Sequence, residues 1–344
     1  MNGVLIIDKP AGLTSHDVVH RVRRILDQRS IGHLGTLDPM ATGVLPLVIG
    51  SFTRLAQFYL TSEKTYEGTI RFGFSTDTYD SEGEPTSTPA SVNIRREELE
   101  AIAARFRGVI AQTPPPFSAK KIKGVPAYKL ARQQKEVRLE PVEVEIKELE
   151  ILSLDRERVR FRARVGSGTY MRCVAHDMGQ ALGCGAHLEL LRRTSVAEFD
   201  ISEAHTLDEL AAAAGKSEGC EVGDSSQPQT TVRPQETVQP LGTVEERPFK
   251  VRVMRHSETG FSPGVHTPEP ESLFVHPRKL LPAFPSVTAD EMVTAYIRNG
   301  RTVNLPELSR SRQVKVFSNQ RDLIAIATRI AGTLFHPKIV LCAP

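Results

Sequence analysis

Apolar positions recur with two different spacings over the first 200 residues. Residues 66–74, 142–146 and 159–165 alternate between apolar residues and polar or small ones, which is the period of a half-buried strand. Residues 4–7 and 44–49 are continuously apolar and predict buried strands. The pattern therefore predicts that a sheet forms much of the core.

Two segments have the helical spacing instead. Residues 18–26 place valine, isoleucine and leucine on one side and arginines on or beside the other, with Thr14 or Ser15 available to cap the helix. Residues 171–182 repeat this spacing, and Gly183 is placed to end the helix. Strands and helices lack a regular strand-helix-strand rhythm, so we predict an α+β fold with a mixed, mainly antiparallel sheet and flanking helices.

The amino-acid composition of the chain changes at about residue 215. Residues 215–272 are rich in Ser, Gly, Gln and Pro and cannot supply a core, which predicts a flexible linker. Residues 1–214 are long enough for a catalytic domain, at roughly 150 residues per domain. Strand-like runs such as 323–327 resume after the linker, so residues 273–344 are expected to form a small β-rich second domain.

Composition narrows the class of protein. The chain has 344 residues, 40% of them hydrophobic and 25% charged, which excludes global disorder. Its four cysteines lack CxxC spacing and indicate neither a disulfide framework nor a zinc site. We see no secretion signal and no apolar stretch of roughly 20 residues, so we expect a cytoplasmic protein and no membrane association.

The net charge of +3 averages two unlike regions. Residues 216–246 carry two basic and six acidic residues, a net −4, so the remaining chain carries +7. Residues 105–135 contain eight basic residues and no acidic one, together with Pro114–Pro116 and Tyr128. Charge runs are usually solvated surface, but this stiff segment predicts an insertion that grips an RNA backbone, with Lys121 among the substrate contacts.

The segment from Gly32 to Gly43, GHLGTLDPMATG, holds the strongest candidate for chemistry. Its three glycines let the backbone approach a ligand closely, and Pro39 keeps Asp38 away from helical dihedral angles. Asp38 is therefore presented from a rigid, extended loop. The alternative is an aspartate that only caps a tight turn.

Further motifs accompany this loop in residues 1 to about 200. They are Asp8-Lys9-Pro10 with Gly12, Thr14 and Ser15; Lys64-Thr65-Tyr66 with Gly73, Thr76-Asp77-Thr78, Asp80 and Gly83; Gln112, Pro114–Pro116, Ser118-Ala119, Lys121, Gly124, Tyr128 and Ala131-Arg132; and Gly168-Thr169-Tyr170 with Arg172, Gly183–His187 and Leu191-Arg192-Arg193. Their order resembles the bacterial-type TruB family of tRNA pseudouridine(55) synthases.

The C-terminal residues carry a weaker likeness to the same family. Three short anchors support it: Leu280-Leu281-Pro282, Asn299-Gly300-Arg301 and Leu334-Phe335-His336-Pro337. They resemble the small β-rich, PUA-like RNA-binding domain that ends family members. The resemblance thus implies a pseudouridine-synthase-like catalytic domain followed by a PUA-like domain.

The resemblance implies isomerisation of uridine 55 in the tRNA T-loop to pseudouridine, without cofactor or metal. The base must leave the ribose, turn and rejoin through carbon 5, which calls for a nucleophile or an electrostatic partner. By family match Asp38 is that nucleophile, either adding to the base or assisting its departure through the ribose. Arg172 matches the partner that keeps the carboxylate ionised; the alternative is an arginine that contacts phosphate.

The same resemblance implies which side chains receive the flipped uridine. Tyr66 packs on the base and is a candidate for handling a proton, while Tyr170 and Leu191 line the pocket. His33 fills the space that flipped bases vacate, and Lys9 is a buried partner that shapes the pocket. Without the family match, Tyr66 is a packing residue on a strand, and Tyr170 and Leu191 are core residues on or near helices.

Other functions stay open at this level. One is a tRNA-binding and folding chaperone that acts independently of catalysis on the same T-arm stem-loop. Another is metal-dependent hydrolysis by His33, Asp38, Asp77 and Asp80, which lack compact ligand spacing; we expect Asp77 and Asp80 to form turns. No obligatory protein partner is evident, and we expect a monomer.

Overall fold

The computed structural model describes residues 1–115, 117, 121–122, 125–126, 139–216, 269–306 and 311–341, with only the backbone at 121–122 and 125–126. Much of the predicted basic insertion and nearly all of the predicted linker lie outside these residues. The domain boundaries that we expect therefore stay predictions.

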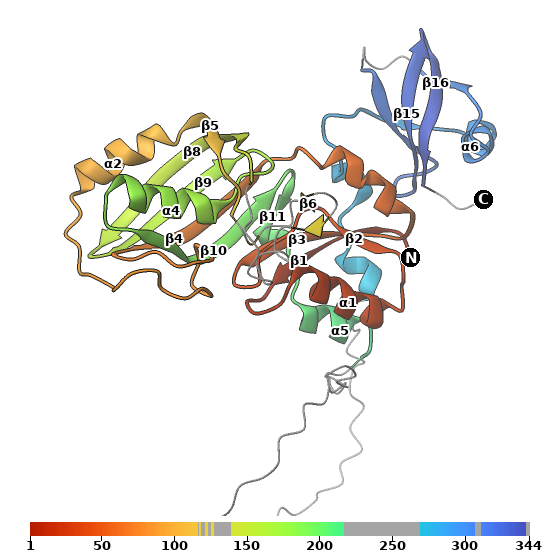
Figure 1. Cartoon of the computed structure of the whole chain (residues 1–344). Helices are drawn as coiled ribbons and strands as arrows, with labels where there is room; N and C mark the ends of the chain where they lie inside the picture. The colour runs from red at the N-terminus through yellow and green to blue at the C-terminus, as the bar shows by residue number, and fades with distance from the viewer. Residues whose placement is uncertain are drawn as a thin grey trace, which may run out of the picture.

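Nine strands in this part of the chain form the main sheet, in the order β1-β3-β10-β4-β9-β8-β5, with β2 paired to β3 and β11 paired to β10 (Figure 1). Every pair is antiparallel except β3 with β10, so the predicted sheet type is confirmed. The strands are β1 Gly3–Lys9, β2 Ile31–His33, β3 Thr42–Ile49, β4 Lys64–Phe72, β5 Gly108–Gln112, β8 Val142–Asp155, β9 Arg158–Val165, β10 Ala186–Val196 and β11 Phe199–Asp200. Two short strands, β6 Lys121–Ile122 and β7 Val125–Pro126, pair with each other.

Helices flank this sheet. They are α1 Ser15–Leu26, α2 Arg96–Arg105, α4 Met171–Ala181 and α5 Leu207–Ala213, with the 3₁₀ helices η1 Gly50–Phe58 and η2 Ile201–Glu203. Helices α2 and α4 pack over strands β8 and β10, whereas α1 and α5 lie at the β1–β3 end (Figure 1). Helix α1 begins at a capping box between Thr14 and Asp17, and α4 ends before Gly183, whose φ is 73°, so both predicted helices are confirmed.

A second sheet follows in residues 269–341, in the order β12-β14-β15-β16-β13. Its elements are η3 Pro270–Leu273, η4 Pro277–Lys279, β12 Ser286–Thr288, α6 Glu291–Arg298, β13 Val303–Asn304, β14 Gln313–Phe317, β15 Leu323–Ala331 and β16 Leu334–Val340. We call these residues the C-terminal module. It is β-rich, as the sequence pattern predicts.

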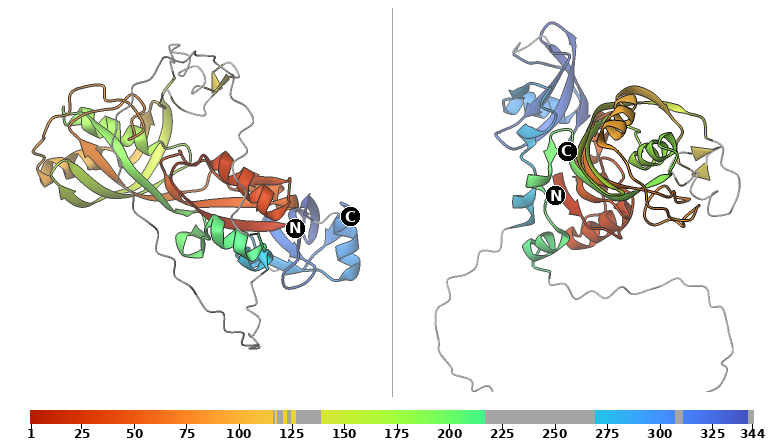
Figure 2. Two further views of the ribbon diagram at one scale, coloured as in Figure 1. Left: turned by 90° about the horizontal axis from the view of Figure 1, so that it is seen from below. Right: turned by 90° about the vertical axis from the view of Figure 1, so that its left-hand side faces the viewer.

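The C-terminal module docks on the β1–β3 end of the main sheet, away from α2 and α4 (Figure 2). The chain enters the module beside β1, where the Val275 amide donates to the Val4 carbonyl at 2.8 Å. A Cβ on Gly3 would lie 2.3 Å from the Phe274 ring, so this close approach requires glycine. One buried cluster then spans both parts, with Val4, Leu34, Leu55, Tyr59 and Phe199 on one side and Leu280, Leu281, Phe317 and Leu341 on the other.

Strand β10 departs from what the sequence pattern suggests. Leu191 is a buried core residue, as expected without the family match, but it lies in this strand, which packs against α4, and not on a helix. The register of β10 against β4 shifts between Leu188 and Leu190 and again between Arg193 and Ser195. Each of these register shifts is a β-bulge or similar irregularity, after which the side chains that face the core change from odd to even positions or back. The alternation of apolar and polar residues that would predict a strand is therefore lost.

Candidate active site

Buried polar groups fix the loop between β2 and β3, residues 34–41. The Lys9 ammonium is inaccessible to solvent and donates to the carbonyls of Pro10, Leu13 and Pro39 at 2.6–3.1 Å. Burial lowers the pKa of Lys9 from 10.5 to about 8. Lys9 thus fixes the backbone next to Asp38 through these three hydrogen bonds. It does not line the cavity beside Asp38.

Two more residues fix the same loop. The Leu37 amide donates to Ser15 Oγ at 2.8 Å. The guanidinium of Arg193, which has no exposed surface, donates to the carbonyls of Gly35, Thr36 and Val44 at 2.8–3.2 Å. Because these bonds satisfy the backbone carbonyls of a turn, the loop is rigid and Asp38 has a defined position.

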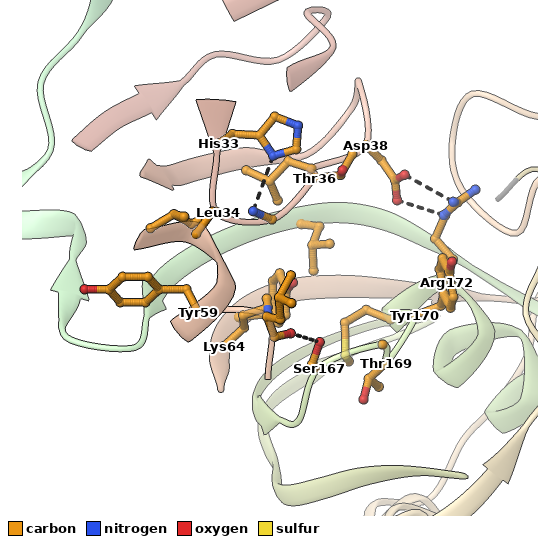
Figure 3. Close-up of a pocket in the computed structure, with 18 of the residues that line it drawn as sticks. His33, Leu34, Thr36, Asp38, Tyr59, Lys64, Ser167, Thr169, Tyr170 and Arg172 are labelled. Carbon is orange, nitrogen blue, oxygen red and sulfur yellow. Dashed lines mark hydrogen bonds and ion pairs between the residues drawn. The ribbon is translucent and has the colours of Figure 1, made fainter. Parts of the chain in front are cut away.

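Asp38 meets Arg172, the second residue of α4. Arg172 Nη2 donates to Asp38 Oδ1 at 3.1 Å, and Nε lies 2.9 Å from Oδ2 (Figure 3). The same guanidinium lies 3.3 Å from Asp80 Oδ2 and donates to the carbonyls of Thr78 and Phe117. Arg172 is 5% exposed, so its contacts are those of a buried counter-charge and its guanidinium is not open to a phosphate.

The cluster Asp38–Arg172–Asp80 therefore holds two carboxylates against one guanidinium. Asp80 is 4% exposed at its side chain, whereas Asp38 is 34% exposed. Burial raises the pKa of Asp38; Arg172 opposes this rise, and Asp80 adds to it. A carboxylate that is more basic than usual and partly open is suited to nucleophilic attack.

Asp38 and Arg172 border a cavity of about 320 Å³, which is in the range of small-molecule sites (Figure 3). The cavity is lined by His33, Leu34, Gly35, Thr36, Leu37, Asp38, Ala56, Tyr59, Leu60, Lys64, Tyr66, Phe117, Ser167, Gly168, Thr169, Tyr170, Met171, Arg172 and Leu191. Its walls come from the loop after β2, from η1, from β4, from the start of α4 and from β10. Segments distant in the chain thus converge on one site.

Flat and apolar side chains form much of this lining. Tyr66 in β4 and Leu191 in the neighbouring strand β10 are each 7% exposed. Tyr170 precedes α4, and the Gln112 side chain bonds both its amide and its carbonyl, at 2.8 Å and 3.1 Å. The two strands and this amide clamp hold the hydrophobic wall in place beside Asp38.

His33 and Lys64 add polar groups to the lining. His33 Nδ1 accepts a hydrogen bond from the Gly35 amide at 3.3 Å, and burial together with Arg193 lowers the His33 pKa. The ring is therefore neutral and suited to stacking. Burial lowers the pKa of Lys64 to about 8, and its ammonium donates to the Ser62 carbonyl.

Of the predicted site residues, the cavity brings together Asp38, Tyr66, Arg172, His33, Tyr170 and Leu191. The side chain of Lys121 lies outside the described residues. Asp80 does form the turn that we expect, because it accepts from Thr78 Oγ1 and the Glu82 amide, but it also pairs with Arg172. Sequence reasoning missed that second role, as well as the loop-holding role of Arg193.

In the part of the chain that the structure describes, no group of three or more His, Cys, Asp or Glu side chains is arranged to hold a metal ion. Asp38 and Asp80 instead share Arg172. Within the same residues, no helix has the length and apolar character needed to cross a membrane.

Comparison with known proteins identifies the family. The N-terminal domain of the TruB family pseudouridylate synthases matches residues 23–171, and the tRNA pseudouridylate synthase B C-terminal domain matches residues 172–240. The tRNA pseudouridine synthase B of Solibacter usitatus is 45% identical over 344 residues, covering 99% of this chain and 100% of the relative. The chain belongs to the TruB family. It is therefore an RNA pseudouridine synthase, an isomerase.

Other relatives and solved structures agree with TruB membership. The tRNA pseudouridine synthase B of Aquifex aeolicus is 47% identical over 61% of this chain and 74% of the relative. The crystal structure of a Cbf5-Nop10-Gar1 complex matches 99% of this chain and 85% of that chain, with a TM-score of 0.63 at 21% identity. At this identity the likeness shows the fold alone, and it confirms the pseudouridine-synthase-like α+β fold with its β-rich, PUA-like C-terminal module.

Proposed function

We propose that this TruB-family enzyme converts uridine 55 in the T-loop of tRNA to pseudouridine, with Asp38 as the nucleophile. The observation that carries the proposal is the Asp38 carboxylate, held by Arg172 at the edge of a base-sized cavity. The choice of tRNA follows the curated relatives, which are named tRNA pseudouridine synthase B. No other partly exposed carboxylate lines this cavity among the described residues.

Asp38 supplies the group that both halves of the reaction need. The glycosidic bond must break, and a new bond must form to carbon 5 of the same uracil, so the nucleophile has to stay beside the base throughout. The loop that Lys9, Ser15 and Arg193 hold keeps Asp38 in place during both steps. Arg172 stabilises the ionised form before attack and the carboxylate that returns after it.

The cavity also suits a base that has left its stack. A uridine inside a folded loop has to be flipped out before its glycosidic bond can be reached, and flat or apolar walls recover part of the lost stacking. Tyr66, Tyr170 and Leu191 supply such walls, and the neutral ring of His33 lies at the same cavity for contact with the RNA. Tyr66 is also the candidate for moving a proton during the rearrangement.

Binding of the T-arm requires contacts beyond this cavity. The predicted basic insertion 105–135 and the predicted C-terminal domain 273–344 are the two parts to which we assign them, with residues 215–272 as the predicted linker between the domains. Each phosphate that Lys121 or its neighbours neutralise steepens the dependence of affinity on salt. We propose a monomer for which tRNA is the partner.

Pseudouridine mapping on a single transcript tests this proposal. The full-length protein is incubated with an unmodified tRNA transcript and with a matched transcript that carries cytidine at position 55. Pseudouridine at position 55 of the first transcript, and at no position of the second, is the expected result. Modification at another uridine, or none, would overturn the assigned position.

A further inference from the structure

Helix η1 belongs to both parts of the molecule. Its C-terminal end contributes Ala56 to the cavity, and Tyr59 and Leu60 directly after it add to the same wall. The other side of η1 carries the C-terminal module, because Arg54 Nη1 donates to the Val340 carbonyl at 2.8 Å and Phe58 packs edge-on against Phe284. The segment from η1 to Leu60 therefore contacts the C-terminal module and the cavity at the same time.

One contact ties the two parts together through polar atoms. Tyr59 is 3% exposed, and its hydroxyl donates to Glu198 Oε1 at 2.6 Å. The same Glu198 oxygen accepts from the Leu281 amide at 2.8 Å, and that amide lies 3.3 Å from the Tyr59 hydroxyl. Figure 3 shows this hydroxyl directed away from Asp38. We call Tyr59, Glu198 and Leu281 the junction.

The junction is built to hold one geometry. Burial raises the pKa of Tyr59, and Glu198 raises it further, so the phenol is protonated and donates this hydrogen bond at neutral pH. Leu281 has a φ of 49°, a left-handed conformation that leucine adopts only where its surroundings require it. The Leu281 amide donates to Glu198 in this arrangement, and a phenol-to-carboxylate bond is among the stronger hydrogen bonds.

Apolar packing surrounds these polar atoms. Leu280 and Leu281 of the module lie in the same buried cluster as Leu34, which lines the cavity, and Tyr59 itself. Closely packed side chains transmit displacements because no empty volume absorbs them. The cavity wall, the junction and the module thus form one continuous body.

We propose that Tyr59 is a positioning residue for the reaction, whose ring is held in the cavity wall by Glu198 and by the Leu281 amide of the C-terminal module. The module then sets the shape of the catalytic cavity in addition to any contact that it makes with RNA. The proposal rests on the cavity at Asp38 being the active site. It assigns to the module an effect on turnover as distinct from affinity.

Steady-state kinetics of Tyr59→Phe and Glu198→Ala test this role. Both variants keep the cavity lining but release the ring from its anchor, so kcat is expected to fall about tenfold while KM stays within about twofold. The fall should be equal for full-length tRNA and for an isolated T-arm stem-loop, because the cavity is the same. The conservative variant Glu198→Gln retains the oxygen acceptor and is expected to recover most of the lost kcat.

Glu203→Gln is the matched control. Glu203 in η2 pairs with Lys279 across the same boundary between the two parts, but its side chain is 36% exposed and neither residue lines the cavity. This variant should keep the wild-type kcat. Melting temperatures of all variants, measured in parallel, report whether each protein is folded at the assay temperature.

A double variant distinguishes positioning from general destabilisation. If the junction acts as a unit, Tyr59→Phe combined with Glu198→Ala lowers kcat no further than either change alone. A kcat of Tyr59→Phe within about twofold of wild type, an effect on KM alone, or an equal loss in Glu203→Gln would overturn the proposal. Loss of turnover in Asp38→Asn alongside such a result would show that the junction assignment alone had failed.

Discussion

Arginine–carboxylate pairs occur in two contrasting settings on this sheet. On the exposed face, Arg158 pairs with Glu189 at 2.8 Å, Arg162 with Glu67 at 2.7 Å, and the neighbouring Arg164 with Glu63 at 3.1 Å. On the covered side, Arg172 serves two carboxylates, Asp38 at 2.9 Å and Asp80 at 3.3 Å. The pairs are alike in chemistry and distance, but Arg172 and Asp80 are 5% and 4% exposed, whereas the three arginines of the exposed face are 42–51% exposed.

The contrast shows which ion pairs matter for function. Exposed pairs gain little because water solvates the separated charges nearly as well as the partners do. In the Asp38–Arg172–Asp80 cluster, Arg172 and Asp80 have almost no access to water and only Asp38 is partly exposed, so removal of any member changes the state of the others. The cluster holds Asp38 in place and sets its pKa, whereas the exposed pairs lie on a solvated face of the sheet away from the cavity.

The largest effect is expected for Arg172→Met. This change removes the guanidinium that Asp38 and Asp80 share and leaves Lys9 as the cation near Asp38, so we expect a loss of about 3–5 kcal/mol in the free energy of unfolding. Turnover should fall at least about 10²–10³-fold because the nucleophile loses its orientation and its stabilising charge. Denaturant unfolding and single-turnover kinetics measure the two effects; a change in unfolding free energy below about 1 kcal/mol would contradict the account.

A smaller effect is expected for Asp80→Asn, and it has a specific pH signature. Because the folded-state pKa of Asp38 is raised, the ionised form exists above that pKa and is lost as the pH falls through it. Asp80→Asn removes a negative charge that raises this pKa, so the acid limb of the kcat/KM profile should move to lower pH. We also expect about a tenfold loss of kcat, because Arg172 loses one anchor. An acid limb that stays in place or moves to higher pH would contradict the cluster.

The smallest effect is expected for Glu67→Gln, the exposed match to Asp80→Asn. It too neutralises one carboxylate beside an arginine, but on the solvated face. The melting temperature should stay within about 2 °C of wild type, and kcat and its pH profile should not change. A loss comparable to that of Asp80→Asn would show that solvent exposure does not separate the two settings.

Local patterns predict much of the fold. Alternation predicts β4, β8 and β9, a capping residue predicts the start of α1, and Gly183 predicts the end of α4. Strand β10 is not predicted by alternation, because its register shifts move the side chains from one face of the sheet to the other. The short helix α5 and helix α2 carry too few periodic apolar residues to stand out among neighbouring polar ones.

The candidate site likewise contains residues that can be named from the sequence and residues that cannot. Asp38, Tyr66 and Arg172 can be named from motifs, since they match the family pattern residue by residue. Asp80 and Arg193 cannot be understood from the sequence alone, because their roles depend on contacts made 92 and about 157 residues away in the chain. Long-range polar pairing leaves no local periodicity, and only the folded sheet brings these groups together.

Asp38→Asn tests the central claim most directly. The amide is close in size to the carboxylate, so the loop should keep its shape and a T-arm stem-loop should bind with an affinity within about threefold of wild type. We predict that pseudouridine formation in that stem-loop, followed by single-turnover kinetics, becomes undetectable. Turnover at a rate comparable to wild type by the Asp38→Asn protein would contradict the assignment of Asp38 as the nucleophile.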